Sequence, residues 1–312
     1  MPGVRDPDAL VLGKSAALAI VEKRVIGWGK NTHGLLGQSV PPTADVSSAE
    51  AIDLKLDGAT DLAIGQVHDD VAACAIVEGQ LRCWGRVAGG VRDLKDSARV
   101  AVRNLDFFQR SGGVPFPLPP VRIGLGASDF ACSILRDDLH GEVGCWGTSR
   151  PWQLLDREAA NKELGISVAH PSPIPSLLAT GSAGACYAVD RAIQCWGRVA
   201  DCDDNLAQWR MLAAPGVVTD IAIGSGHHCA VLKGGELWCR GADGDAFGAT
   251  KGNCELRRVP LPSPAVSVVA GSGFTCVLTQ PGAAYCLGAP NGRFGCDAGT
   301  RGTDACRVSL TP

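Results

Sequence analysis

Apolar positions in this chain come in short runs that end at glycine, and each run is followed by segments in which apolar and polar residues alternate. Four such runs are Leu62–Gly65, Val121–Gly124, Ile221–Gly224 and Val268–Gly271. After each run come a turn, an alternating segment, a tight turn, a second alternating segment, a loop and a short final segment. Alternation with a period of two is typical of strands. The pattern therefore predicts units of four short strands.

The unit repeats along the whole chain. Five copies carry a cysteine at the start of the first alternating segment and a second cysteine in the next one, often followed by Trp-Gly; they begin at Cys74, Cys132, Cys186, Cys229 and Cys276. A sixth copy keeps the frame with Leu18 and Gly27 in the cysteine positions. Repetition at this spacing is typical of repeat architectures, and four short strands per repeat favour propeller blades. We expect an all-β protein, a single β-propeller domain over residues 1–312 with six four-stranded blades.

The two ends of the chain predict how the ring closes. The first copy starts at Leu10–Gly13 without a preceding strand, and the chain ends with Arg307–Leu310, which resembles Arg258–Leu261. We therefore expect the last strand to complete the first blade, which would remove exposed sheet edges. The prolines of the fourth segments (Pro115, Pro117, Pro260) suit outer edge strands, where a missing N–H does no harm.

Two loops are enlarged, at residues 86–120 and 148–175. Each contains a candidate helical piece, around residues 102–109 and 154–164. Insertions within single repeats map to surface loops, often on the binding face.

Composition and charge narrow the function classes. The net charge is −3 with both signs interspersed, so the basic stripe of a nucleic-acid binder is missing. No run of 18 apolar residues is present that would span a bilayer. The 14 cysteines in paired positions favour an oxidising compartment. We expect a periplasmic or extracellular protein whose export signal has been removed; a cytosolic protein with reduced thiols is the alternative.

The repeat resembles a known family. The copies WGKNTHGLLG from Trp28 and IAIGSGHHCAVLKGGELWCRG from Ile221 are similar to the regulator of chromosome condensation repeat, in the cysteine-bearing form of exported bacterial proteins. The resemblance implies propeller blades, of which the best-known members have seven, the alternative to our count of six. It says little about function, because relatives include a nucleotide-exchange factor and an enzyme-inhibiting propeller. The turn histidine of the family is present only at His228, and we do not expect exchange activity.

The paired cysteines predict disulfides across hairpins. Residues that face one another across a hairpin lie at a Cα separation that a disulfide tolerates. We expect the bridges Cys74–Cys83, Cys132–Cys145, Cys186–Cys195, Cys229–Cys239 and Cys276–Cys286. For the remaining four cysteines we prefer Cys296–Cys306 and Cys202–Cys254. A zinc site is the rival, but paired C-x2-C spacing is absent.

Catalytic or cofactor chemistry has little support in the sequence. No nucleophile-elbow motif is present, and the turns GSGHH and GSGFT open strands and not helices, so they do not predict a phosphate cradle. The segment Asp201–Asn205 lacks the glycine and glutamate of a calcium loop. The repeated Trp28, Trp84, Trp146 and Trp196 favour packing between blades. We expect no metal, no cofactor and no enzyme activity.

The sequence therefore favours an exported, non-catalytic binding or scaffold propeller that engages another protein through loops on one face. The alternatives are a carbohydrate-binding or cell-envelope structural module and, less favoured, a lyase or glycosidase with a central pocket. Loop residues with acidic or aromatic side chains are the candidates for partner contact. They are Asp69, Asp70, Asp129, Phe130, His227, Phe274, Phe107, Phe108 and Trp152.

Overall fold

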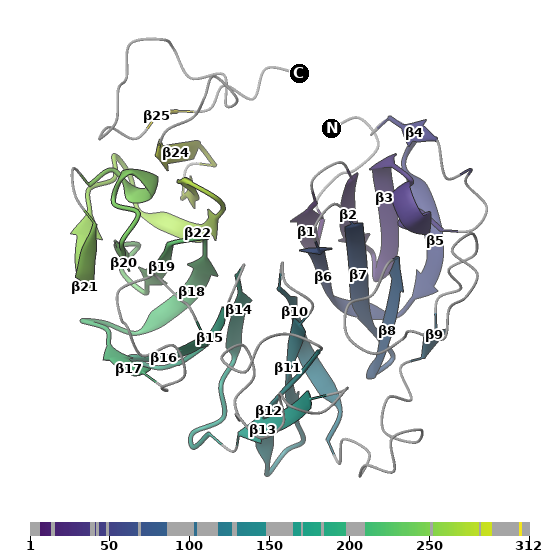
Figure 1. Ribbon diagram of the computed structural model, residues 1–312, viewed down its shortest axis with the longest axis horizontal. Helices are drawn as coiled ribbons and strands as arrows, with labels where there is room; N and C mark the ends of the chain where they lie inside the picture. Colours follow the sequence, from purple (N-terminus) through teal and green to yellow (C-terminus); the bar gives the residue numbers. More distant parts are fainter. Residues whose placement is uncertain are drawn as a thin grey trace. The chain divides into compact units, whose positions relative to one another are not determined.

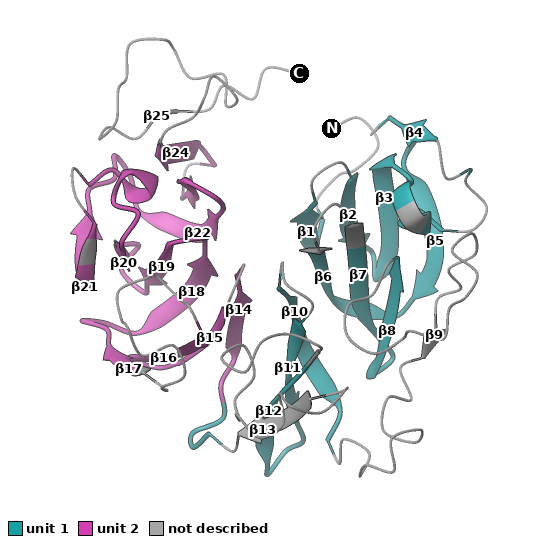
Figure 2. Ribbon diagram, viewed as in Figure 1, with its two compact units in different colours: residues 1–174 teal, residues 175–312 magenta. Residues whose placement is uncertain are grey.

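The computed structural model contains six antiparallel sheets among the residues it describes (Figure 1). The described residues are 7–13, 16–37, 41, 44–47, 50–67, 70–85, 103–104, 118–126, 130–147, 165–169, 171–181, 184–197, 210–249, 252–280, 282–288 and 306–307. The chain divides into two compact units, residues 1–174 and 175–312, each holding three sheets (Figure 2). The prediction of an all-β protein built from six repeated sheets agrees with this topology.

The first unit holds the first three sheets. The first sheet consists of β1 (Ala9–Leu12), β2 (Ala16–Val21), β3 (Arg24–Lys30), β4 (Asp45–Val46) and β5 (Ile52–Asp57), with the 3-10 turn η1 (Thr32–Gly34) after β3. The second sheet consists of β6 (Ala59–Val67), β7 (Asp70–Val77), β8 (Gln80–Gly85) and β9 (Arg103–Asn104). The third consists of β10 (Pro120–Leu125), β11 (Phe130–Arg136), β12 (Gly141–Gly147) and β13 (Gly165–Ala169).

The second unit holds the other three. The fourth sheet consists of β14 (Leu177–Thr180), β15 (Gly184–Val189), β16 (Ala192–Gly197) and β17 (Arg210–Ala213). The fifth consists of β18 (Val218–Ile223), β19 (His227–Leu232), β20 (Leu237–Gly241) and β21 (Asn253–Val259), with the 3-10 turn η4 (Asp245–Phe247). The sixth consists of β22 (Ala265–Ala270), β23 (Phe274–Thr279), β24 (Ala284–Gly288) and β25 (Cys306–Arg307).

Short hairpin turns connect the second and third strands of the sheets. In the first two sheets both central turn residues have positive φ, at Glu22 and Lys23 and at Glu78 and Gly79. Such turns match the right-handed twist of the flanking strands and fix the register of the hairpin. The cysteines consequently face each other across the ladder, as in the pair Cys74 and Cys83.

The structure forms all five predicted hairpin disulfides. They join Cys74–Cys83, Cys132–Cys145, Cys186–Cys195, Cys229–Cys239 and Cys276–Cys286 with Cα separations of 4.0 to 4.1 Å. Cys254 is also disulfide-bonded. Because Cys202, Cys296 and the side chain of Cys306 lie outside the described residues, the pairings Cys202–Cys254 and Cys296–Cys306 stay predictions.

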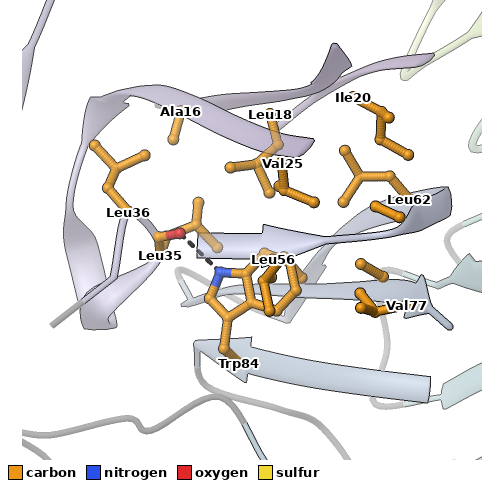
Figure 3. Packing of buried hydrophobic residues seen from close by; sticks show 13 residues of the cluster. Ala16, Leu18, Ile20, Val25, Leu35, Leu36, Leu56, Leu62, Val77 and Trp84 are labelled. Carbon is orange, nitrogen blue, oxygen red and sulfur yellow. Dashed lines mark hydrogen bonds between the residues drawn. The ribbon is translucent and has the colours of Figure 1, made fainter. Parts of the chain in front are cut away.

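Packing between neighbouring sheets explains the repeated tryptophan. Trp84 of the second sheet is fully buried among residues of the first, including Leu18, Leu36 and Leu56 (Figure 3). Its indole Nε1–H donates a hydrogen bond of 2.8 Å to the carbonyl oxygen of Leu35, next to η1. Trp146 of the third sheet packs in the same way against Ala63 and other residues of the second. The prediction that the tryptophans pack between sheets is confirmed at these two positions.

Two expectations need correction. The last described strand, Cys306–Arg307, pairs with β24 and so completes the sixth sheet, while the first sheet is completed by its own β4 and β5. The prediction that the C-terminal strand completes the first blade is therefore wrong for these residues; residues 308–310 lie outside the described part. Within the first enlarged loop, residues 103–104 form a strand and not the expected helix. The second loop contributes β13, which follows the helical piece expected around residues 154–164. That piece and the rest of the first one lie outside the described residues and stay predictions.

Candidate functional site

The turns between the first and second strands share one backbone hydrogen bond. In five sheets the N–H of a glycine donates to the carbonyl oxygen of the residue that opens the second strand, over 2.8 to 3.0 Å. The pairs are Gly13 to Ala16, Gly126 to Phe130, Gly181 to Gly184, Gly224 to His227 and Gly271 to Phe274. In the third sheet this places the turn glycine at Gly126, two residues after the Gly124 expected from sequence. Backbone groups hold these turns, so their side chains are available for other contacts.

The turns of the fifth and sixth sheets lie side by side and make one exposed strip. The N–H of Ser225 donates to the carbonyl oxygen of Gly271 over 3.3 Å. The hydroxyl oxygens of Ser225 and Ser272 are 3.4 Å apart, and both side chains are exposed. We call Ser225, Ser272 and the half-buried Phe274 and Asp243 the turn strip. Since the strip joins two consecutive sheets, a ligand on it would contact both.

An aromatic ring packs under the turn glycine in three sheets. A Cβ placed on Gly126, Gly224 or Gly271 would lie 2.0 to 2.3 Å from a ring atom of Phe130, His227 or Phe274. The absence of a side chain at the glycine is therefore what allows the ring to close over the backbone. Phe130 is 1% exposed and His227 is 0% exposed. The prediction that these two side chains contact a partner is wrong, because the turn covers both of them.

The other predicted contact residues divide into two groups. Phe274 is half-buried at the turn strip, and Asp70 opens β7. The remaining five, Asp69, Asp129, Phe107, Phe108 and Trp152, lie outside the described residues. The strip itself includes Ser225 and Ser272, which sequence reasoning missed; their signal was the repeated Gly-Ser-Gly before two of the second strands.

His227 forms a buried link between the fifth and sixth sheets. Its Nε2 lies 2.8 Å from the hydroxyl oxygen of Thr275, which is itself 3.7 Å from Sγ of Cys229. Burial lowers the pKa of His227, although the nearby Asp243 carboxylate acts in the opposite direction. The acid, imidazole and hydroxyl resemble a catalytic relay in composition. Because His227 and Thr275 have no exposed surface, no substrate reaches them, and their role is to join the sheets.

Two half-buried carboxylates make an equivalent link, one in each unit. Oδ2 of Asp61 accepts a 2.7 Å hydrogen bond from the N–H of Ile123 in the third sheet, and Oδ2 of Asp220 accepts a 2.9 Å bond from the N–H of Val268 in the sixth. Each aspartate follows a register shift near the start of its strand. A bulge redirects a side chain in this way. Burial raises the pKa of both carboxyls above 3.8, despite the backbone N–H groups that favour the charged form.

This pKa shift gives a pH prediction for Asp220→Asn. A carboxyl with a raised folded-state pKa contributes stability that is fully present below the unfolded value of about 3.8 and is lost as pH rises through the folded value. The amide keeps an oxygen for the N–H of Val268 but does not titrate. We expect the wild type to lose stability relative to Asp220→Asn as pH rises through that window, measured by urea unfolding at several pH values. A wild-type advantage that grows with pH would contradict the shift.

No group of three or more His, Cys, Asp or Glu side chains that could hold a metal ion occurs in the described part of the chain. Among the same residues, no helix is long and apolar enough to span a membrane.

Comparisons with known proteins agree on the repeat and the fold. Residues 218–246 match the family model of the regulator of chromosome condensation (RCC1) repeat. This segment contains β18, β19 and β20, including one half of the turn strip. No curated protein matches the sequence.

Among solved structures, Prp20p from Saccharomyces cerevisiae has a TM-score of 0.67 and 18% identity, covering 97% of this chain and 77% of that one. Human WBSCR16 has a TM-score of 0.71 and 15% identity, covering 98% and 82%. The yeast RCC1 (Prp20) structure with bound Kap60 has a TM-score of 0.67 and 19% identity, covering 97% and 75%. At these identities the similarity establishes the fold.

Proposed function

We propose that this chain, whose fold is that of the RCC1-like β-propellers, is a non-catalytic binding scaffold that holds a protein partner through the turn strip and neighbouring loops. The observation that carries the proposal is the strip itself. Rigid sheets present backbone-held turns whose serines are exposed and lie side by side across two repeats. Rigid turns lose little conformational entropy on binding, which favours affinity.

The solved structures of similar fold support a protein as the partner. Prp20p has binding properties toward Gsp1p and histones, and yeast RCC1 is bound by Kap60. The net charge of this chain is only −3, which by itself does not select a basic partner such as a histone. The five hairpin disulfides support an exported location, since such bridges persist in oxidising compartments.

We further propose that the six sheets form one closed ring. In the fifth sheet Ala222 and Val231 are buried in the cluster shared with the sixth. The equivalent residues of the sixth sheet, Val269 and Leu278, are 59% and 42% exposed. These apolar positions are exposed in the sixth sheet but buried in the fifth. Such an exposed apolar face favours coverage by a further sheet.

The first sheet also exposes an apolar position that its equivalents bury. Leu10 of β1 is 45% exposed, whereas its equivalents Ile123 and Ile221 are 6% and 8% exposed. If the ring closes, Val269→Lys places a charge in a buried joint and lowers the unfolding midpoint. Met211→Lys, at a 71% exposed position of β17, is the matched control and should leave the midpoint unchanged. Equal effects of the two substitutions would contradict closure.

Site-specific photo-crosslinking in the native host tests the binding face. A photo-reactive residue at Ser225 or Ser272 should give one discrete protein adduct. The control is Gly234, which is exposed at the hairpin end of the same sheet, opposite to the strip. The proposal requires that the adduct form at the strip and not at Gly234, and that the purified adduct partner bind more weakly to Phe274→Ser. Adducts removed by glycosidase would instead favour the carbohydrate-binding alternative, and equal adducts at both ends would contradict a single binding face.

A further inference from the structure

The fifth sheet replaces a residue pair that the other sheets keep. Across the second and third strands, four sheets pair alanine with tryptophan: Ala17 with Trp28, Ala73 with Trp84, Ala131 with Trp146 and Ala185 with Trp196. The sixth pairs Thr275 with Leu287. The fifth pairs His228 with Arg240, which are only 3% and 4% exposed. Two basic side chains therefore occupy a position that elsewhere holds an apolar or uncharged pair.

This pair lies in the joint between the fourth and fifth sheets. Ile223 of β18 is the register partner of His228. Ile223 shares a buried cluster with Ala230 of β19 and with Cys186 of β15 in the fourth sheet. A Cβ on Gly181, at the end of β14, would lie 2.4 Å from Ile223, so the two sheets are in close contact beside the histidine. A second charge formed here, on the imidazole beside the Arg240 guanidinium, could not be hydrated without separating the sheets.

The imidazole of His228 is held in its neutral form. Burial, followed by the charges of Arg240 and His227, lowers the pKa of His228 to about 3. Neither ring nitrogen has a hydrogen-bond partner among the described groups. Among the described residues, the titratable groups of the neighbouring strands and turn are engaged elsewhere. Asp220 of β18 accepts from the N–H of Val268 in the sixth sheet, Tyr187 of β15 donates to Gln194, and the Asp243 carboxylate acts on His227.

We propose that the His228–Arg240 pair makes the joint between the fourth and fifth sheets an acid-sensitive hinge, which opens when His228 takes up a proton. The joint is closed at neutral pH because the buried ring is uncharged. In acid, His228 takes up a proton, and its imidazolium then lies beside the permanently charged guanidinium of Arg240. This charged state is favoured only when water hydrates it, and water reaches it only when the two sheets separate. Among the described register pairs of this frame, only His228–Arg240 contains an imidazole. His227, in the joint between the fifth and sixth sheets, differs from His228 because its Nε2 has a partner in the hydroxyl of Thr275.

The sign follows from linkage. A histidine whose folded-state pKa is depressed contributes stability that is present above its unfolded value of about 6.5 and is lost as pH falls toward the folded value. One proton taken up on opening multiplies the opening constant by about ten for each pH unit within this window. Between about pH 7 and pH 5 the expected increase is roughly 25-fold.

Hydrogen exchange followed by mass spectrometry on the full chain tests the hinge, with rates corrected for the intrinsic effect of pH. Peptides that contain β14 and β18 should lose protection by roughly 25-fold between about pH 7 and pH 5, while β10 to β12 should not. His228→Gln, which does not titrate, should abolish this loss. A loss of the same size in that variant, or an equal loss in all sheets, would overturn the proposal.

Two further variants keep the test decisive if His228→Gln folds poorly. The double variant His228→Ala with Arg240→Trp restores the pair of the other sheets and should show no acid response in β14 and β18. His227→Phe, which matches Phe130 and Phe274 in the same frame, removes the neighbouring histidine but should leave the response of β14 and β18 in place. If the acid response disappears with His227→Phe and persists in the double variant, His227 and not His228 controls the opening, and the proposal is refuted.

Discussion

Reduction of the five described hairpin disulfides is expected to unfold the protein. Each bridge closes a loop with a sequence separation of 9 to 13 residues. On the chain-entropy relation such a loop stabilises the folded state by about 2.5–3 kcal/mol. Five of them together contribute roughly 13 kcal/mol, which is comparable to the whole stability of about 5–15 kcal/mol that folded proteins have. The reduced chain should therefore show no cooperative thermal transition.

Circular dichroism after refolding in a strong thiol reductant measures this effect. Denaturation before reduction is needed because most of the bridged sulfurs are buried, for example those of Cys132 and Cys145. The control is the single-hairpin variant Cys229→Ala with Cys239→Ala, which should lose only about 2.5–3 kcal/mol and still fold. A reduced chain that melts cooperatively within a few degrees of the oxidised protein would show that sheet packing alone is sufficient.

Trp84→Ala is expected to cost about 3–5 kcal/mol of the free energy of unfolding. The side chain is fully buried in the cluster between the first and second sheets, and it supplies the hydrogen bond to the carbonyl of Leu35 (Figure 3). Truncation leaves a cavity and an unpaired buried carbonyl. Urea denaturation of the wild type and the variant measures the difference.

Trp84→Phe separates the two contributions. Phenylalanine fills most of the cavity but donates no hydrogen bond, so we expect a loss of about 1–2 kcal/mol from the unpaired carbonyl and the remaining volume difference. The two variants should therefore differ clearly. Equal losses for alanine and phenylalanine, or a loss below about 1 kcal/mol for alanine, would show that the tryptophan does not join the two sheets.

The sequence predicted the repeated sheets and their hairpin disulfides because both depend on residues that are close together in the chain. Alternation along each strand and a short turn fix the register of a hairpin. Cys74 and Cys83 therefore face each other whatever the rest of the chain does, and the repeated tryptophan frame follows the same register. Five of the six first strands, the five bridges and the packing of Trp84 could be derived in this way, whereas β14 (Leu177–Thr180) was not predicted.

Only the tertiary structure decided what each neighbouring sheet covers. The sequence placed Phe130 and His227 at a turn, but the glycine backbone above them makes these rings buried. It likewise did not show that Asp61 and Asp220 reach the backbone of the next sheet, or that Cys306–Arg307 pairs with β24. The physical reason is that burial and pairing at sheet edges depend on contacts with residues far away in the sequence. The replacement of an Ala–Trp pair by His228–Arg240 can therefore be interpreted only once the structure shows that the pair is buried between two sheets.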